Sequence, residues 1–217
     1  MGENLAIAID GLIQIWDVQT GTILDNLTNP DQTVSISWSP DGTQLAYFDR
    51  AEGLHVVRPS FTAPAFVLPT PTARPIVPAY SQVAWSPDGT MIAVSSGIFG
   101  CDQVNLNNFS IRIFDATTFV EIKQLIGHTC TVSGFDWSPD SQQIVSYNVR
   151  QAEAYIWDVA SETLLRTIPM NTQDEFSCME FLGDLIASSF PDNGVYLWIQ
   201  MMAKTIPLGG TAIDWRP

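Results

Sequence analysis

The sequence predicts an all-β fold built from repeated four-stranded antiparallel sheets, and three observations support this prediction. One phrase occurs three times, as SWSPDGTQLAY from Ser37, AWSPDGTMIAV from Ala84 and DWSPDSQQIVS from Asp136. Segments in which apolar residues alternate flank these copies, with the two-residue period of half-buried strands. Each unit later ends a segment on an aromatic residue, in LIQIWD, IRIFD, EAYIWD and VYLWI. Self-similarity at a regular spacing is typical of repeat architectures.

The repeated phrase predicts a β-hairpin. The apolar segment TVSISW ends at Ser-Pro-Asp-Gly, where Pro presets φ and where Asp and Gly favour a tight turn. A second apolar segment, TQLAYF, follows the turn. A third strand then ends on the aromatic residue, and a fourth begins after VQTG, ATT or ASE. Four short antiparallel strands of this kind make one blade of a β-propeller.

The blades follow one another along a single domain that covers residues 1–217. With strands named a to d from the axis outward, NLAIAI, LIQIWD and TILDNL are strands b, c and d of a first blade. Complete blades are predicted at about 31–79, 80–128, 129–173 and 174–208, and TAIDWRP at the end is a lone strand a. Pairing of 211–215 with 4–9 would form a composite blade from 1–30 plus 209–217. The ring would then close at five blades of about 43 residues each, a typical blade length; the alternative is a segment of a seven-bladed ring.

In these features the sequence resembles the WD-repeat β-propeller family, and its Ser-Pro-Asp-Gly hairpins are similar to those of bacterial TolB-type propellers. The resemblance covers essentially the whole chain and is clearest over residues 127–158, which begin with Gly-His and end with Trp-Asp. In that family a His, a Ser or Thr of strand b, an Asp of the next turn and the Trp form a structural hydrogen-bond relay. The resemblance assigns His128, Ser146 and Trp157 to this relay. No Asp falls in the turn NVRQ, so the relay is expected to be incomplete.

The chain is strongly acidic, with nine Lys and Arg against twenty-three Asp and Glu and a formal net charge of −14. Such a chain repels phosphate backbones, and its positive residues are scattered, so we expect no nucleic-acid binding. The longest apolar runs are shorter than the ~20 residues of a membrane helix. No signal peptide is visible at the N-terminus. These features predict a cytoplasmic protein without membrane insertion.

Three cysteines are too few and too unevenly spaced for a disulfide framework. The odd number favours a reducing compartment, so unpaired thiols at Cys101 and Cys130 are the first expectation. Both residues fall on the same rim of the predicted disc, which leaves a disulfide between them as an alternative. A zinc site that includes His128 would lack a fourth ligand. Cys178 lies in a strand a and is expected in the core.

Two irregular segments are the candidate partner-binding regions. Residues 58–80 hold six of the fourteen prolines, and residues 96–109 form a long connection between strands b and c. Long loops on a rigid scaffold often carry binding sites, and extended Pro-rich chain loses little entropy on docking. The candidate partner-binding residues are Phe61, Phe66, Arg74, Tyr80, Ile98 and Phe99. The alternative is that these side chains pack their own loops onto the blades.

A further set of residues is predicted to surround the axis. The residues that precede the last aromatic residue of each strand a are Ser37, Ala84, Asp136, Glu180 and Asp214. The two-residue period points them the same way, into a narrow channel, while the aromatic residues wedge between the blades. Three carboxylates, of Asp136, Glu180 and Asp214, would repel one another there. They predict either a bound calcium or magnesium ion or pairing with backbone amides or water.

The motifs favour a binding function over catalysis. The sequence contains no Gly-x-Ser-x-Gly, no phosphate-binding Gly loop and no metalloprotease His pair. We therefore expect a non-catalytic scaffold that binds a protein or peptide on the loop-rich rim, with no cofactor besides the possible axial cation. One alternative is a carbohydrate-binding or glycoside hydrolase-like five-bladed propeller, with Asp31, Asp174 and Glu175 as candidate carboxylates. Another is a structural subunit of a larger assembly, and the sequence leaves the oligomeric state open.

Overall fold

The fold is known from a computed structural model, whose described residues form strands and the connections between them. The described residues are 4–9, 12–28, 33–49, 53–58, 64–69, 82–95, 101, 109–148, 150, 153–169, 178–182, 185–190, 194–199 and 205–208. They build one sheet of three strands and four sheets of four strands. Every pairing between these strands is antiparallel. The prediction of an all-β fold with four-stranded antiparallel sheets is confirmed.

Each sheet consists of strands that are consecutive in the chain. The first sheet contains β1 (Asn4–Ile9), β2 (Leu12–Asp17) and β3 (Thr22–Thr28). The second contains β4 (Thr33–Trp38), β5 (Leu45–Asp49), β6 (Gly53–Val57) and β7 (Pro64–Pro69). The third contains β8 (Val83–Trp85), β9 (Met91–Ser95), β10 (Ser110–Asp115) and β11 (Glu121–Ile126). The fourth contains β12 (Gly134–Trp137), β13 (Gln143–Asn148), β14 (Glu153–Asp158) and β15 (Thr163–Pro169). The fifth contains β16 (Cys178–Leu182), β17 (Leu185–Phe190), β18 (Gly194–Ile199) and β19 (Thr205–Leu208).

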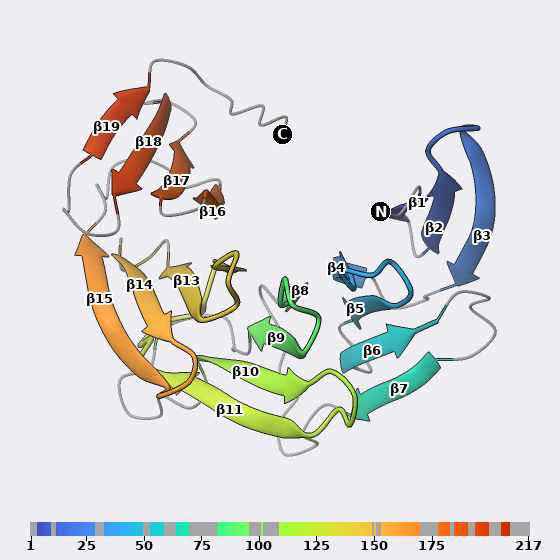
Figure 1. The fold of residues 1–217 in the computed structure, drawn as a ribbon, viewed down its shortest axis with the longest axis horizontal. Coiled ribbons are helices and arrows are strands. Elements are labelled where there is room, and N and C mark those ends of the chain that lie inside the picture. Colours follow the sequence, from blue (N-terminus) through green and yellow to red (C-terminus); the bar gives the residue numbers. More distant parts are fainter. Residues whose placement is uncertain are drawn as a thin grey trace.

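The sheets stand side by side around a common centre, as the blades of a propeller do (Figure 1). The first strand of each four-stranded sheet lies nearest the centre, and the last strand lies outermost. The first and fifth sheets lie at the two ends of this arc. Within the described residues, β1 pairs with β2 alone and has no strand on its inner edge. Residues 209–217 lie outside the described residues, so the composite blade, the closure of the ring and the count of five blades remain predictions.

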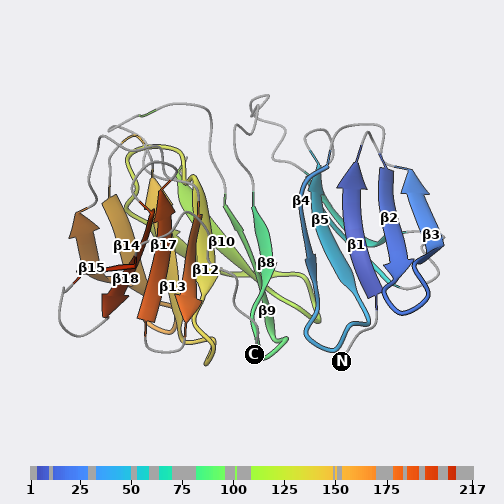
Figure 2. The ribbon, with the colours of Figure 1, turned by 90° about the horizontal axis from the view of Figure 1, so that it is seen from above.

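The connections divide between two rims, seen edge-on in Figure 2. The two rims are named from the four-stranded sheets. The turn rim holds the hairpins between their first and second strands and the turns between their third and fourth strands. The loop rim, on the opposite side, holds the connections that follow their second and fourth strands. Residues 70–82 and 96–109 both join strand ends at the loop rim.

The Pro-rich segment 58–80 is not one irregular excursion, which corrects the sequence-based expectation. Its central part, Pro64–Pro69, is strand β7 and pairs with β6 at the outer edge of the second sheet. Residues 58–63 therefore join strand ends at the turn rim, whereas 70–82 join strand ends at the loop rim. Proline is tolerated in such an edge strand because the outer edge needs no ladder donors.

The repeated hairpin turns are held by their own side chains. Ser39 Oγ donates to Asp41 Oδ1 at 2.6 Å, and the Thr43 amide donates to the same carboxylate at 3.0 Å. The hydrogen bond from Ser39, with those from Thr43, lowers the pKa of Asp41. Gly42 has φ of 70°, which glycine adopts without strain. In the third copy Ser141 takes this conformation with φ of 61°.

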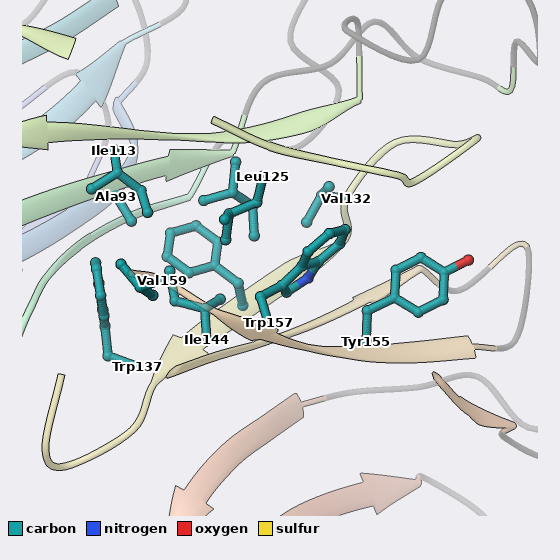
Figure 3. Packing of buried hydrophobic residues seen from close by; sticks show 11 residues of the cluster. Ala93, Ile113, Leu125, Val132, Trp137, Ile144, Tyr155, Trp157 and Val159 are labelled. Carbon is teal, nitrogen blue, oxygen red and sulfur yellow. The ribbon is translucent and has the colours of Figure 1, made fainter. Parts of the chain in front are cut away.

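The core lies between neighbouring sheets. A cluster of buried residues joins the third and fourth sheets, and nine of its side chains are labelled in Figure 3. Trp137 of the inner strand β12 packs there against Ala93 and Ile113 of the preceding sheet. Trp85 lies in the equivalent cluster between the second and third sheets. The inner aromatic residues thus wedge between blades, which leaves the other face of each inner strand toward the centre.

Candidate functional site

One buried polar group of the core is the relay formed by His128, Ser146 and Trp157. Ser146 Oγ lies 2.7 Å from His128 Nε2 and accepts a hydrogen bond of 2.8 Å from Trp157 Nε1. His128 lies in the link between β11 and β12, and the other two residues lie on β13 and β14. All three side chains are buried. The relay therefore fastens the link between two blades to the second of them.

The tautomer of His128 decides the direction of its hydrogen bond to Ser146. Ser146 Oγ accepts from the indole N–H of Trp157. With the imidazole proton on Nδ1, the serine hydroxyl donates to Nε2; with the proton on Nε2, the ring donates to Ser146 Oγ. Burial lowers the pKa of His128 to about 3, so the ring is neutral near pH 7. Nδ1 is buried, and among the described residues it has no hydrogen-bond partner. This is the atom that the Asp of the family relay would face.

Aromatic packing surrounds this relay. The rings of His128 and Tyr155 lie 4.4 Å apart, centroid to centroid. Burial, assisted by the hydrogen bond to Glu153, raises the pKa of Tyr155 to about 12. A Cβ at Gly127 would lie 2.9 Å from a ring carbon of Trp157. Gly127 therefore leaves room for the Trp157 ring, which a larger residue would contact too closely. Because the three relay side chains are buried, the relay is structural rather than open to a substrate.

The candidate partner-binding residues do not form one set. Phe66 lies in β7, whose backbone is described and faces Val56 of β6. Phe61, Arg74, Tyr80, Ile98 and Phe99 lie outside the described residues. The connection that contains Phe61 joins strand ends at the turn rim, whereas the other four residues belong to connections at the loop rim. Strand β7 separates the connection that contains Phe61 from the one that contains Arg74 and Tyr80. The role of these residues in partner binding stays a prediction.

A disulfide joins Cys101 to Cys130, so the first expectation of two unpaired thiols was wrong. The Cα atoms lie 3.9 Å apart, and the two residues form an isolated antiparallel bridge. Cys101 belongs to the β9–β10 connection and Cys130 to the β11–β12 link. Spacing along the sequence did not reveal the pair, because the bond depends on two connections meeting at the loop rim. The backbone of Cys178 lies in β16.

The inner strands form a repeated set of contacts that sequence reasoning only partly anticipated. Asp136 Oδ2 accepts a hydrogen bond of 2.8 Å from the amide of Phe181 in the next sheet. Two serines of β4, at positions 35 and 37, accept from the amides of Val83 and Trp85, each at 3.1 Å. Gln82 Oε1 accepts from the Phe135 amide at 2.8 Å. Each side chain thus satisfies an inward backbone N–H of the following blade, which would otherwise lack a sheet partner. For Ser37 and Asp136 the signal was a polar residue directly before the aromatic residue of the inner strand. Ser35 and Gln82 do not occupy that position, so this signal did not reveal them.

The axial cation stays a prediction, because Asp136 is the one carboxylate of the three whose side chain is described. Among the described side chains, no group of three or more His, Cys, Asp or Glu could hold a metal ion. Asp136 pairs with a backbone amide, which is the alternative that the sequence left open. The backbone of Glu180 lies in β16, opposite Ala187, and Asp214 lies outside the described residues. The catalytic carboxylates of the hydrolase alternative, Asp31, Asp174 and Glu175, also lie outside them.

The fold and the relay together define a repeat protein made of propeller-type blades. A family model described as "WD domain, G-beta repeat" matches residues 119–158, which contain the whole relay. The chain is also similar to WD repeat-containing protein 36 of Homo sapiens, with 28% identity over 124 residues. That match covers 56% of this chain and 13% of the human protein. The chain therefore contains a repeat of the WD type over residues 119–158 and is similar to WD-repeat proteins.

Proteins of this family generally mediate protein–protein interactions and are typically non-enzymatic scaffolds. The described part of the chain contains no helix long and apolar enough to cross a membrane.

Proposed function

We propose that the chain is a non-catalytic interaction scaffold that binds a protein or peptide partner on its loop rim. The observation that supports this proposal is that the strand ends joined by the two long connections, 70–82 and 96–109, lie at the same rim. The first connection leads from the second sheet into β8 of the third, and the second connection joins β9 to β10 within the third sheet. A rigid stack of blades holds the ends of these connections at fixed positions, which is the usual arrangement of binding loops.

The contrast between the two rims supports this choice. On the turn rim the polar side chains are used within their own turns: Ser86 Oγ donates to Asp88 and Ser138 Oγ donates to Asp140, each at 2.6 Å. Their turns are short and alike. The longer connections join strand ends at the loop rim, and their sequences contain four of the candidate residues, Arg74, Tyr80, Ile98 and Phe99. Arg and aromatic side chains are enriched among the residues that dominate interfaces.

Affinity capture with matched variants tests the proposal. The loop variant replaces Arg74, Tyr80, Ile98 and Phe99 by Ala; the control replaces the exposed turn-rim residues Thr117 and Gln142 by Ala. Proteins retained by wild type and by the control, but lost with the loop variant, are then purified and their Kd values are measured. The proposal requires at least a tenfold weaker Kd for the loop variant, about 1.4 kcal/mol. A partner that binds the loop variant as tightly as wild type contradicts it.

The cytoplasmic location predicted from the sequence remains a prediction. Cell fractionation of the native protein, with a known cytoplasmic enzyme as marker, provides the test.

A further inference from the structure

The Cys101–Cys130 disulfide has one exposed and one buried end. Cys101 is exposed, whereas Cys130 is 4% exposed. The two residues are 29 positions apart, and β10 and β11 lie between them. An external thiol can therefore approach the sulfur of Cys101, while the protein covers the sulfur of Cys130.

The two ends also differ in what else holds them. The link around Cys130 is attached to β13 without the disulfide: the Ser133 amide donates to the Tyr147 carbonyl at 2.9 Å, and Asn148 Nδ2 donates to the Thr131 carbonyl. His128 is tied to Ser146 in the relay. The described contacts of Cys101 are the disulfide and the bridge pairing with Cys130. The β11–β12 link therefore keeps these hydrogen bonds to β13 when the disulfide opens.

From this asymmetry we propose that Cys101–Cys130 is a thiol–disulfide exchange site that a dithiol reductant opens through Cys101 in the folded protein. A thiolate of the dithiol attacks Cys101 Sγ and forms a mixed disulfide. The Sγ–Sγ bond breaks, and Cys130 Sγ leaves as a thiolate and takes up a proton. The second thiol of the reductant then displaces Cys101 as a thiol. Two electrons pass from the dithiol to the protein disulfide, and the products are two protein thiols and an oxidised, cyclic dithiol.

The test uses the full chain with Cys178→Ala, so that every thiol detected comes from the pair. The oxidised protein is incubated with glutathione, a monothiol, and the mixed disulfide is located by peptide mass spectrometry. In a second experiment, the oxidised protein is reduced with dithiothreitol at several urea concentrations below the unfolding transition. We expect the glutathione adduct on Cys101 and a reduction rate that does not change with urea. Hydrogen exchange after reduction should stay unchanged over 127–148.

Three results would each overturn the proposal. One is an adduct on Cys130. Another is a reduction rate that rises with urea in parallel with global unfolding, which would show that the bond opens only in the unfolded chain. The third is faster exchange across β12 and β13 after reduction, which would make the bond a structural fastener of the fourth blade. The variant Cys101→Ser serves as the permanently open form, and its exchange pattern should match that of the reduced protein.

Discussion

The carboxylate of Asp136 accepts a hydrogen bond of 2.8 Å from the backbone amide of Phe181, which lies in the next blade. The amide belongs to the inner edge of β16, where no further strand of the described residues continues the sheet. A buried amide without an acceptor is costly, so the side chain of one blade completes the backbone hydrogen bonding of the next. The serines at positions 35 and 37 do the same for β8. This ladder explains why a carboxylate is placed close to the axis.

Replacement of Asp136 by Ala should destabilise the protein by about 1–3 kcal/mol, because the Phe181 amide loses its acceptor. Asp136→Asn retains an acceptor oxygen at the same position, so its loss in free energy of unfolding should be less than half of that of Asp136→Ala. Urea unfolding followed by tryptophan fluorescence measures both. Equal losses for the two variants would show that the negative charge, rather than the hydrogen bond, stabilises this position.

The same register leads to a test of ring closure. The amides of Trp85 and Phe181 each donate to the side chain that precedes the aromatic residue of the preceding inner strand, Ser37 and Asp136. If residues 211–215 form the inner strand beside β1, the same register places the Asp214 carboxylate at the amide of Trp38.

Asp214→Ala should then increase hydrogen exchange at the Trp38 amide about tenfold or more, since each factor of ten corresponds to 1.4 kcal/mol of local opening. Glu3→Ala is the control for loss of one negative charge near the end of the chain. Exchange at Trp38 that is the same in Asp214→Ala and wild type would contradict closure at five blades and would favour a longer ring.

Ser146→Ala should destabilise the protein by about 2–4 kcal/mol, because His128 Nε2 and Trp157 Nε1 would both be left buried without a partner. Ser161→Ala, at an exposed turn position, is the matched control and should cost less than about 1 kcal/mol. Thermal and urea unfolding measure both values. A loss at Ser146 no greater than that at Ser161 would mean that the relay adds nothing to stability.

His128 should make the free energy of unfolding decrease as the pH is lowered below 6.5, the ordinary pKa of histidine. Its pKa is lowered from 6.5 to about 3 in the folded protein, so between these values the unfolded chain binds the extra proton. The stabilisation is complete above pH 6.5 and is lost by about 1.4 kcal/mol per pH unit as the pH falls toward 3. At pH 5 the loss is about 2 kcal/mol. His128→Gln removes this titration, so its free energy of unfolding should decrease less than that of wild type between pH 7 and 5. Parallel curves for the two proteins would contradict the assignment.

Much of the fold could be predicted because its rules act over short distances along the chain. Alternating apolar residues and the Ser-Pro-Asp-Gly turns predicted the hairpins, and the aromatic ends of the third strands marked the repeating unit. The relay members were recognisable from the family motif alone. The sequence did not predict that Cys101 is bonded to Cys130, nor that β7 divides the Pro-rich segment, because neither feature follows from a local pattern.

By itself, the sequence determined the strands, their turns and the order in which they build sheets, since a strand and its hairpin depend on neighbouring residues. Only the tertiary structure decided that Cys101 meets Cys130, that β7 separates Phe61 from Tyr80, and that Asp136 caps an amide of another blade. The Asp136–Phe181 contact spans 45 residues of sequence. Such contacts form when the packing of blades brings distant side chains within hydrogen-bonding or covalent reach, and that packing depends on many apolar contacts at once.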